Sequence, residues 1–243
     1  MPFTLAHPAI ILPLSHRYFH FPALVLGSMS PDFIYYLSGK PADGGHTIFH
    51  SEWLNLPLCL CFYAIYVAVL KVPLWANLPQ RWSHRLPDSP RRPLWLWLLI
   101  FLFSAWVGML SHIFLDNFTH GSGTFVRALP FLQQEFYIPM YKWCQYGGTV
   151  LGLVCIAWYL RTTAKRYPHP NTRTTRQKSQ FWLLTFVLSS VTFVGWNMMD
   201  FIPLKQHGIW IVRALDCFVI ALFIVSLPHK FRMTSGPNLK IFL

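Results

Sequence analysis

The sequence predicts an all-α, polytopic membrane protein, and three features indicate this fold class. Apolar residues make up 54% of the 243 residues, whereas charged residues make up only 12%. Soluble domains carry roughly 25% charged residues, about twice this fraction. The mean hydropathy is +0.39, and long apolar runs alternate with basic segments. Together these features exclude an ordinary soluble enzyme and an intrinsically disordered chain.

Two apolar stretches, residues 8–14 and 21–29, open the chain, and His16, Arg17 and His20 interrupt them. No basic segment precedes them, so a cleaved signal peptide is not expected. Two short helices that lie at the outer membrane interface, or dip into it as re-entrant helices, fit this pattern. A broken spanning helix is the alternative, and it would place residues 1–6 on the other side of the membrane.

Five membrane-spanning helices are expected after this N-terminal segment. A span needs about 17–25 mainly apolar residues. The candidates are residues 54–70, 94–115, 147–160, 181–199 and 209–227, of which the third is the shortest. We expect a single integral-membrane domain over residues 1–243. It consists of an N-terminal metal-ligand segment (1–53), the transmembrane helices (54–227) and a C-terminal cytoplasmic tail (228–243).

The distribution of basic residues predicts the orientation of the chain. A net charge of +12 would suggest nucleic-acid binding in a soluble protein, but here the charge lies between the spans. Fourteen Lys and Arg fall in segments 71–92, 161–178 and 230–240, whereas the segments on the other side carry five. Because Lys and Arg gather in cytoplasmic loops, we expect a multi-pass inner-membrane protein with its N-terminus outside and its C-terminus in the cytoplasm. Membrane lipid is the expected partner, and no nucleic acid is expected.

Two further features have structural interpretations. Arg213 and Asp216 lie three residues apart in the last span, and an intrahelical ion pair would lower the cost of both charges. The five cysteines lack CxxC spacing, so neither a disulfide framework nor a zinc ribbon is expected.

The residues that most strongly indicate a chemical function lie at the end of the second span. His112, Asp116 and His120 have the spacing i, i+4, i+8, so they share one stripe if the helix extends that far. Imidazole and carboxylate groups are ligands for zinc, and also for manganese or iron. A polar triad at the end of an apolar span is costly unless it has a use, which favours a metal site over a capped helix end.

Three more candidates lie in the N-terminal segment. His46 and His50 have the i, i+4 spacing that lets two imidazoles share a metal on a helix. Asp32 follows Pro31 where a helix should begin, so it is either a cap or a carboxylate that binds metal or accepts a proton. His7 precedes Pro8 and is expected on an extended segment or at a helix start.

These pieces also form a resemblance. The opening Met-Pro-Phe-Thr-Leu-Ala-His-Pro-Ala, the segment Leu-Gly-Ser-Met-Ser-Pro-Asp, the His-x-x-x-His pair and Ser-His-x-x-x-Asp resemble a family of bacterial integral-membrane proteins of unknown function. That family is similar to membrane-bound metal-dependent hydrolases, and remotely to the zinc-dependent phospholipase C and P1 nuclease group. The resemblance implies as metal ligands His7, Asp32, His46 or His50, His112, Asp116 and His120.

The chain departs from the phospholipase pattern after His120, where the second His-x-x-x-Glu/Asp pair of a three-metal centre is missing. A centre with one or two metal ions is therefore expected. The function this suggests is a metal-dependent hydrolase of phosphoesters, which include lipid headgroups, at the outer membrane face. Asp32 or Asp116 would bridge metals or accept the proton. The alternatives are a transporter that uses the His/Asp cluster as a relay and a scaffold without catalytic activity.

Overall fold

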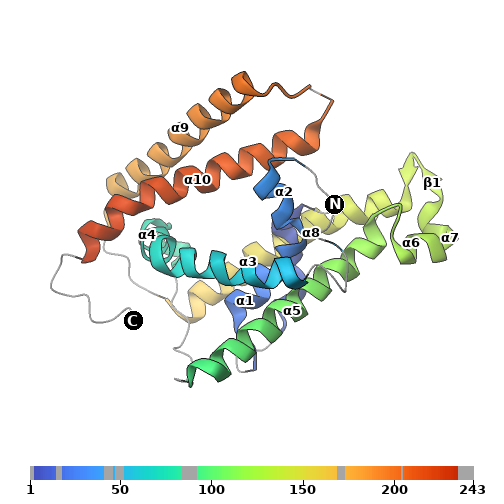
Figure 1. The fold of residues 1–243 in the computed structure, drawn as a ribbon, viewed down its shortest axis with the longest axis horizontal. Coiled ribbons are helices and arrows are strands. Elements are labelled where there is room, and N and C mark those ends of the chain that lie inside the picture. The colour runs from blue at the N-terminus through green and yellow to red at the C-terminus, as the bar shows by residue number, and fades with distance from the viewer. Residues whose placement is uncertain are drawn as a thin grey trace. The chain divides into compact units, whose positions relative to one another are not determined.

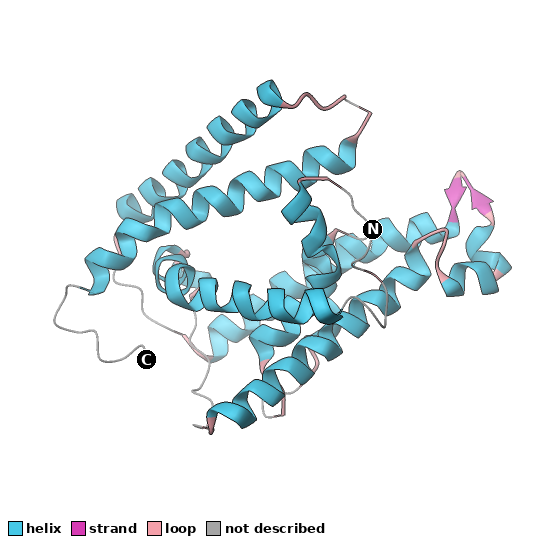
Figure 2. Ribbon diagram, viewed as in Figure 1, coloured by secondary structure: helices cyan, strands magenta, loops and turns pink. Residues whose placement is uncertain are grey.

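The computed structural model describes residues 3–14, 18–40, 46, 52–83, 92–168, 173–203 and 205–234. Helices dominate this part of the chain (Figure 2). Its only strands are β1 (Glu135–Phe136) and β2 (Ile138–Pro139), which form a short antiparallel hairpin. The predicted all-α class is confirmed.

Four helical segments are long and apolar enough to cross a membrane, and each contains a predicted span: Trp53–Asn77, Leu94–Ala128, Thr175–Met199 and His207–Pro228. The first consists of α3 (Glu52–Ile65), a π-helical turn η3 (Tyr66–Leu70) and α4 (Lys71–Asn77). The second joins α5 (Leu94–Thr119) to the short α6 (Thr124–Ala128), which α7 (Pro130–Gln133) follows. The others are α9 (Thr175–Met199) and α10 (His207–Thr234). Lys71, expected in a loop, lies inside the first segment.

The predicted fifth span, residues 147–160, lies within α8 (Met140–Arg166). With 27 residues, α8 is long enough to cross a membrane. It is not among the four most apolar segments, because Gln145 precedes its apolar stretch and Arg161, Lys165 and Arg166 follow it. Length therefore supports the fifth span, whereas composition supports only four.

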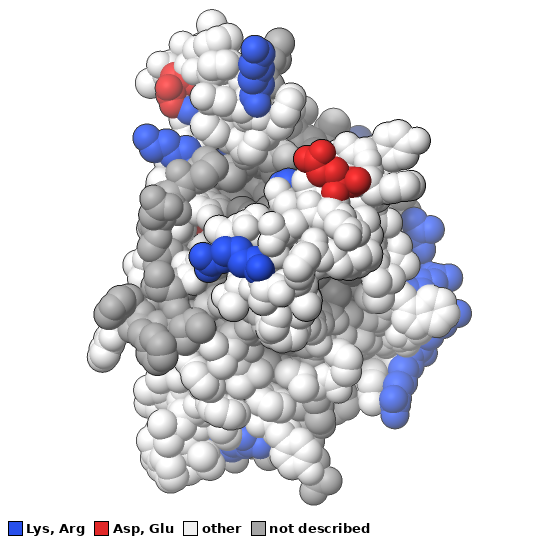
Figure 3. Space-filling view, turned by 90° about the vertical axis from the view of Figure 1, so that its right-hand side faces the viewer, with Lys and Arg blue, Asp and Glu red and all other residues white. Residues whose placement is uncertain are grey.

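The chain divides into two compact units. The first contains Met1–Ile34, Asp43–Tyr63 and Pro87–Thr162, and the second contains Tyr35–Ala42, Ala64–Leu86 and Thr163–Leu243. Uncharged side chains cover most of the face drawn in Figure 3. Such a surface suits helices that lipid surrounds.

The N-terminal segment of the first unit forms two short helices that follow two long ones. The 3₁₀-helix η1 (Thr4–Ile11) lies along α8, where the Phe3 N–H donates to Thr149 Oγ1 at 3.1 Å. The helix α1 (Phe21–Gly27) lies along α5, where the His20 N–H donates to Ser104 Oγ at 2.9 Å. Eight residues further along both elements, Ser28 O lies 2.8 Å from His112 Nδ1.

These contacts show in which direction η1 and α1 run along the long helices. Since residues 20 and 28 pair with residues 104 and 112, α1 runs parallel to α5 over about 12 Å. At the start of α1, the Phe21 ring stacks on Tyr159, far along α8, with ring centroids 5.6 Å apart. The N-terminal segment therefore passes along α8 and returns along α5. Its backbone is packed against these two long helices.

Glycines allow α1 to approach α5 closely. A Cβ atom on Gly27 would lie 2.0 Å from Ala105 O, and one on Gly108 would lie 2.3 Å from Leu24 O and 2.7 Å from Ser28 N. Both overlaps involve backbone atoms, which cannot rotate away. Gly108 stands one turn before His112, so the same contact brings the backbone of residue 28 to the imidazole.

Gly108→Ala is expected to lower the free energy of unfolding by about 1–3 kcal/mol, the usual cost of overpacking. The matched control is Gly195→Ala in α9, where a Cβ meets nothing within 4 Å. Because the added methyl group meets no other atom, Gly195→Ala should stabilise the protein by about 0.5–1 kcal/mol, since alanine favours the helix over glycine. Thermal unfolding of both variants in detergent measures the difference, and equal midpoints would contradict the close approach.

In the second unit, α9 and α10 pack side by side (Figure 1). Arg213 of α10 forms its ion pair with Asp200, at the end of α9, and its guanidinium also lies over the Trp196 ring, 5.1 Å from the centroid. The predicted Arg213–Asp216 pair is therefore wrong. The long arginine side chain reaches a carboxylate of the neighbouring helix, which a count of residues along α10 alone does not reveal.

Candidate metal centre

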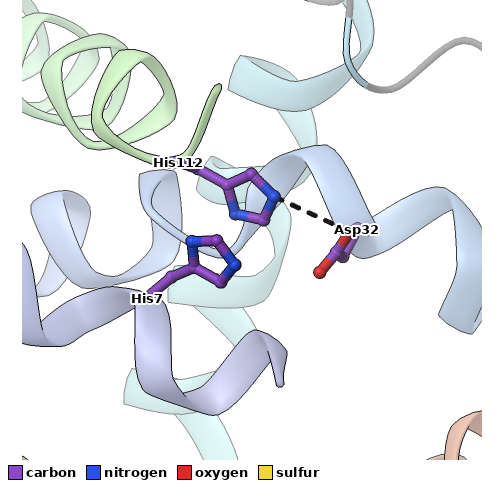
Figure 4. Close-up of side chains that lie close together, drawn as sticks. All are labelled: His7, Asp32 and His112. Atoms are coloured by element: carbon purple, nitrogen blue, oxygen red, sulfur yellow. Dashed lines mark ion pairs between the residues drawn. The ribbon is translucent and has the colours of Figure 1, made fainter. Parts of the chain in front are cut away.

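Three segments of the first unit bring imidazole and carboxylate groups to one point. η1 carries His7, the 3₁₀-turn η2 (Ser30–Asp32) carries Asp32, and α5 carries His112 and Asp116. The rings of His7 and His112 lie face to face, with centroids 3.7 Å apart and planes inclined by 11° (Figure 4). Asp32 lies beside this stack, with Oδ1 3.8 Å from His112 Nε2.

Asp116 is surrounded by histidines. Its carboxylate oxygens lie 3.3 Å from His112 Nε2, 3.4 Å from His46 Nε2 and 3.7 Å from His7 Nε2. His46 also approaches Asp32, with Nε2 3.3 Å from Oδ1. The structure thus brings together His7, Asp32, His46, His112 and Asp116.

Two hydrogen bonds orient the buried ligand candidates. His112 Nδ1 lies 2.8 Å from the carbonyl oxygen of Ser28. Because a carbonyl only accepts, Nδ1 is the donor in this bond, which leaves Nε2 as the ring nitrogen that faces the cluster. The Thr4 hydroxyl donates to Asp32 Oδ2 at 2.5 Å, which leaves Oδ1 directed toward His46 and His112.

The cluster is buried, and its polar atoms are not satisfied. His7, Asp32 and His112 are at most 1% exposed, and Asp116 is 8% exposed. Among the described residues, no hydrogen-bond partner is found for several of their buried atoms, namely both ring nitrogens of His7, Asp32 Oδ1, His112 Nε2 and both carboxylate oxygens of Asp116. Leaving such groups unpaired costs about 1–3 kcal/mol each, and more for charged groups. Because buried polar groups in native proteins nearly always have a partner, this set of atoms favours a site that binds a ligand.

The electrostatics differ between the two N-terminal histidines. Burial, together with the nearby His112, lowers the pKa of His7 to about 3, so its imidazole is neutral at neutral pH. Burial also acts to lower the pKa of His46, but its ion-pair contacts with the Asp116 and Asp32 carboxylates outweigh it and raise that pKa to about 9. A cation among these groups is therefore favoured. No Lys or Arg in the described part of the chain forms an ion pair with either carboxylate.

Two groups of three side chains could hold a metal ion, since their ligand atoms lie within 4.8 Å of one another: His7, Asp32 and His112, and His46, His112 and Asp116. A divalent cation would neutralise the two carboxylates, and imidazole nitrogens suit nitrogen-binding metals. The donor set therefore fits a divalent metal, although it does not specify which one.

His120 stands apart from these groups. α5 ends at Thr119, and His120 follows in an extended conformation (φ −116°, ψ 139°). The predicted stripe therefore holds for His112 and Asp116 but not for His120, because the helix stops one residue too early. The His120 ring turns back, with Nδ1 3.0 Å from the carbonyl oxygen of Asp116 and 3.6 Å from its Oδ1.

The N-terminal candidates also differ from expectation. His7 lies inside η1, not at a helix start, so the expectation based on Pro8 is wrong. The contacts of η1 with α8, through Phe3 and Ala6, outweigh the local preference of a residue before proline. His46 lies in a bend, whereas His50 and the rest of the predicted 46–50 helix lie outside the described residues.

Sequence reasoning missed Thr4 and the carbonyl group of Ser28. Thr4 and His7 are three residues apart, and side chains at i and i+3 eclipse each other in a 3₁₀-helix. That spacing could have linked Thr4 to the site once the segment was known to be 3₁₀-helical. The Ser28 carbonyl has no such signal, because its position depends on how α1 packs against α5.

A family model described as a domain of unknown function (DUF4184) matches residues 1–229. The chain belongs to the DUF4184 family. No curated protein and no solved structure matches it. The DUF4184 assignment confirms the expected membership of a family of unknown function, and it implies no activity. The Asp and His side chains of the cluster all lie within the matched residues.

Proposed function

We propose that this protein is a membrane-embedded hydrolase that uses a divalent metal ion to cleave phosphoesters. The observation that carries the proposal is that His7, Asp32, His112 and Asp116 bring to one site buried polar atoms that have no hydrogen-bond partner among the described residues. A scaffold gains nothing from such a cluster, because well-packed apolar side chains would be at least as stable. Zinc is the preferred ion for this nitrogen and oxygen donor set, and manganese or iron are alternatives.

The hydrogen bonding supports a single ion. Both ligand groups contain His112, and its Nδ1 is engaged by the Ser28 carbonyl. The one remaining lone pair, on Nε2, can bind only one ion. The two groups are therefore two descriptions of one centre, in which three imidazoles and two carboxylates face the same point.

The residues of the centre divide into those that are buried and those that are partly exposed to solvent. His7, Asp32 and His112 are enclosed, whereas the side chains of His46 and His120 are 29% and 30% exposed. Water and substrate would reach the centre past these two rings. When bound, the ion supplies a water of lowered pKa and positive charge opposite the developing oxyanion. Asp32 or Asp116, both of which face the same point as the imidazoles, would accept the proton of the attacking water.

The test is the metal content of the full chain, purified in detergent, together with its hydrolysis of a generic phosphodiester such as bis(p-nitrophenyl) phosphate. We expect about one metal ion per chain, and activity that a chelator removes and the metal restores. Metal-free protein that transports an ion or a proton would favour the relay. Metal-free protein with neither activity would favour the scaffold.

We also propose that the centre lies at the outer face of the inner membrane, with the C-terminus in the cytoplasm. The excess of basic residues requires both α5 and α8 to cross, so that residues 78–92 and 167–174 lie on the same side. A contact in the second unit supports this, because Asn77 at the end of α4 accepts hydrogen bonds from the Arg173 guanidinium (3.4 Å) and the Trp182 indole (3.0 Å).

Cysteines introduced at positions 43 and 122, in a variant without the natural cysteines, are expected to react with a membrane-impermeant maleimide from the periplasmic side only. A cysteine introduced at position 173 should react only after the membrane is opened. Labelling of positions 43 and 122 from opposite sides would contradict the shared outer site.

A further inference from the structure

The second unit carries an acidic side chain in the middle of a membrane-spanning segment. Asp216 lies nine residues after the start of the His207–Pro228 segment and twelve residues before its end, or about 14 Å and 18 Å along the helix. Only 8% of Asp216 is exposed. Ionisable residues at this depth are costly and rare, face the interior of a helix bundle, and mark proton or ion pathways.

The carboxyl group of Asp216 has no partner among the described residues. Its Oδ2 atom is buried without a hydrogen bond, and no Lys, Arg or His of that part of the chain forms an ion pair with it. Arg213 lies one turn before it, but the guanidinium pairs with Asp200 and donates to Asn197 Oδ1 at 3.4 Å. The Arg213 Nε atom is also buried without a partner there. A donor and an acceptor on one side of α10 are therefore both unsatisfied.

The helix α9, which packs against α10, brings no charge to Asp216. Two aromatic pairs on either side of Asp216 show the register of these helices, with ring centroids 5.6 Å apart in each: Phe186 with Phe218, and Phe193 with Trp210. The stretch of α9 opposite Asp216 therefore falls within residues 187–192, and none of these is titratable.

The first span also packs against α10, through η3 and α4. The titratable side chain of η3 is Tyr66, a phenol that is uncharged at neutral pH. That of α4 is Lys71, which is exposed. On α10 itself, the titratable residues within one turn of Asp216 are Arg213 and the neutral thiol of Cys217. Arg213 is therefore the cation with the shortest route to Asp216.

The cost of an unpaired charge decides the state of Asp216. An ionised carboxylate without a partner is strongly disfavoured in an apolar interior, and the group avoids that cost by holding a proton. Its ionised form needs a cation, and Arg213 stands at the i−3 position, where opposite charges on a helix pair. Since no ion pair joins Arg213 to Asp216 while the guanidinium is at Asp200, Arg213 serves one carboxylate at a time.

We propose that Asp216 is a proton-binding site in the membrane-spanning part of the second unit, and that Arg213 is the partner of its ionised form. With Arg213 at Asp200, as in the structure, Asp216 holds the proton. When Arg213 turns to Asp216, the carboxyl group releases that proton to water, and Asp200, whose side chain is 69% exposed, is left to solvent. This site goes beyond the proposed hydrolase, because none of its residues belongs to the metal centre.

The test is the reaction of the full chain, in phosphatidylcholine vesicles at pH 7, with the apolar reagent dicyclohexylcarbodiimide. A protonated carboxyl group adds to it: the proton goes to one nitrogen, the oxygen bonds to the central carbon, and the adduct rearranges to a stable N-acylurea. Trypsin then gives peptides 214–230 and 179–205, in which Asp216 and Asp200 are the only acids. Mass spectrometry measures the label on each.

We expect at least about tenfold more label on peptide 214–230 than on peptide 179–205. An exposed carboxyl group with the usual pKa of about 3.9 is protonated in only about one molecule in a thousand at pH 7. The label on Asp216 should fall as the pH is raised from 7 to 9. Asp216→Asn should abolish it without loss of the fold, because asparagine has the size of a protonated carboxyl group. An unlabelled peptide 214–230, or label that appears only below pH 5, overturns the proton-binding site.

Asp200→Asn tests the role of Arg213. It removes the charge that holds the guanidinium, so Arg213 becomes available to Asp216, and the label at pH 7 should fall about tenfold as Asp216 ionises. The matched control is Glu135→Gln, which changes an exposed acid of β1 in the first unit and should leave the label unchanged. Equal label on peptide 214–230 in these two variants overturns Arg213 as the partner.

Discussion

His112→Ala is expected to abolish metal binding by the purified protein. His112 Nε2 belongs to both ligand groups, so its loss leaves neither of them complete. The effect should exceed the 10–100-fold loss of metal affinity typical of mutating a residue that only supports a ligand. Asp116→Asn should have a similar effect, since it removes one of the two negative charges and the contacts with the surrounding imidazoles. Metal content after gel filtration, by mass spectrometry, measures both.

Two histidines outside the metal cluster serve as controls. His207 is exposed at the start of α10, in the second unit. His20 lies among Tyr63, Trp97 and Phe101, and its Nδ1 caps α1 by accepting from the Ala23 N–H at 3.3 Å. His207→Ala should change nothing, and His20→Ala should lower stability but retain metal. Metal retention in all four variants would defeat the assignment of the centre to α5.

Asp32→Asn is expected to fold normally and to be inactive, with much of its metal lost. In the structure Asp32 is fully buried, its Oδ1 faces His46 and His112, and its Oδ2 accepts from Thr4. If the carboxylate acted as a helix cap, asparagine would replace it with little cost. A role as ligand or base requires the negative charge, which asparagine lacks. In metal-free protein the variant should be as stable as the natural chain or more so, because a buried charge is removed.

Thr4→Val tests the orientation of the Asp32 carboxylate separately from its charge. It keeps the carboxylate of Asp32 but removes the hydroxyl that orients it, so metal affinity should fall about 10–100-fold without being abolished. The control is Thr192→Val in α9, whose hydroxyl bonds only within its own helix at Leu188 and Ser189. Full metal and full phosphodiesterase activity in Asp32→Asn would leave Asp32 a structural residue, and the centre would have to be rebuilt around Asp116.

Much of the fold follows from local sequence pattern. Apolar runs of sufficient length predict the membrane helices, because backbone groups in lipid must be satisfied within the helix itself. The i, i+4 spacing of His112 and Asp116 likewise predicts that they share a helix face, since both lie within α5. The weakest of the predicted spans, residues 147–160, is also the helix whose composition falls short in the structure.

The assembly of the centre depends on contacts between distant segments. The sequence by itself determined that the chain is helical, with runs apolar enough to span a membrane, and that His112, Asp116 and His120 lie near the end of one of them. Only the tertiary structure decided that η1 descends along α8, that α1 returns along α5 and that Asp200, not Asp216, pairs with Arg213. The reason is that hydropathy and helical period act over a few residues. By contrast, the approach of Gly108 to the backbone of Leu24 and Ser28 depends on two surfaces that fit together, and no local pattern encodes that fit.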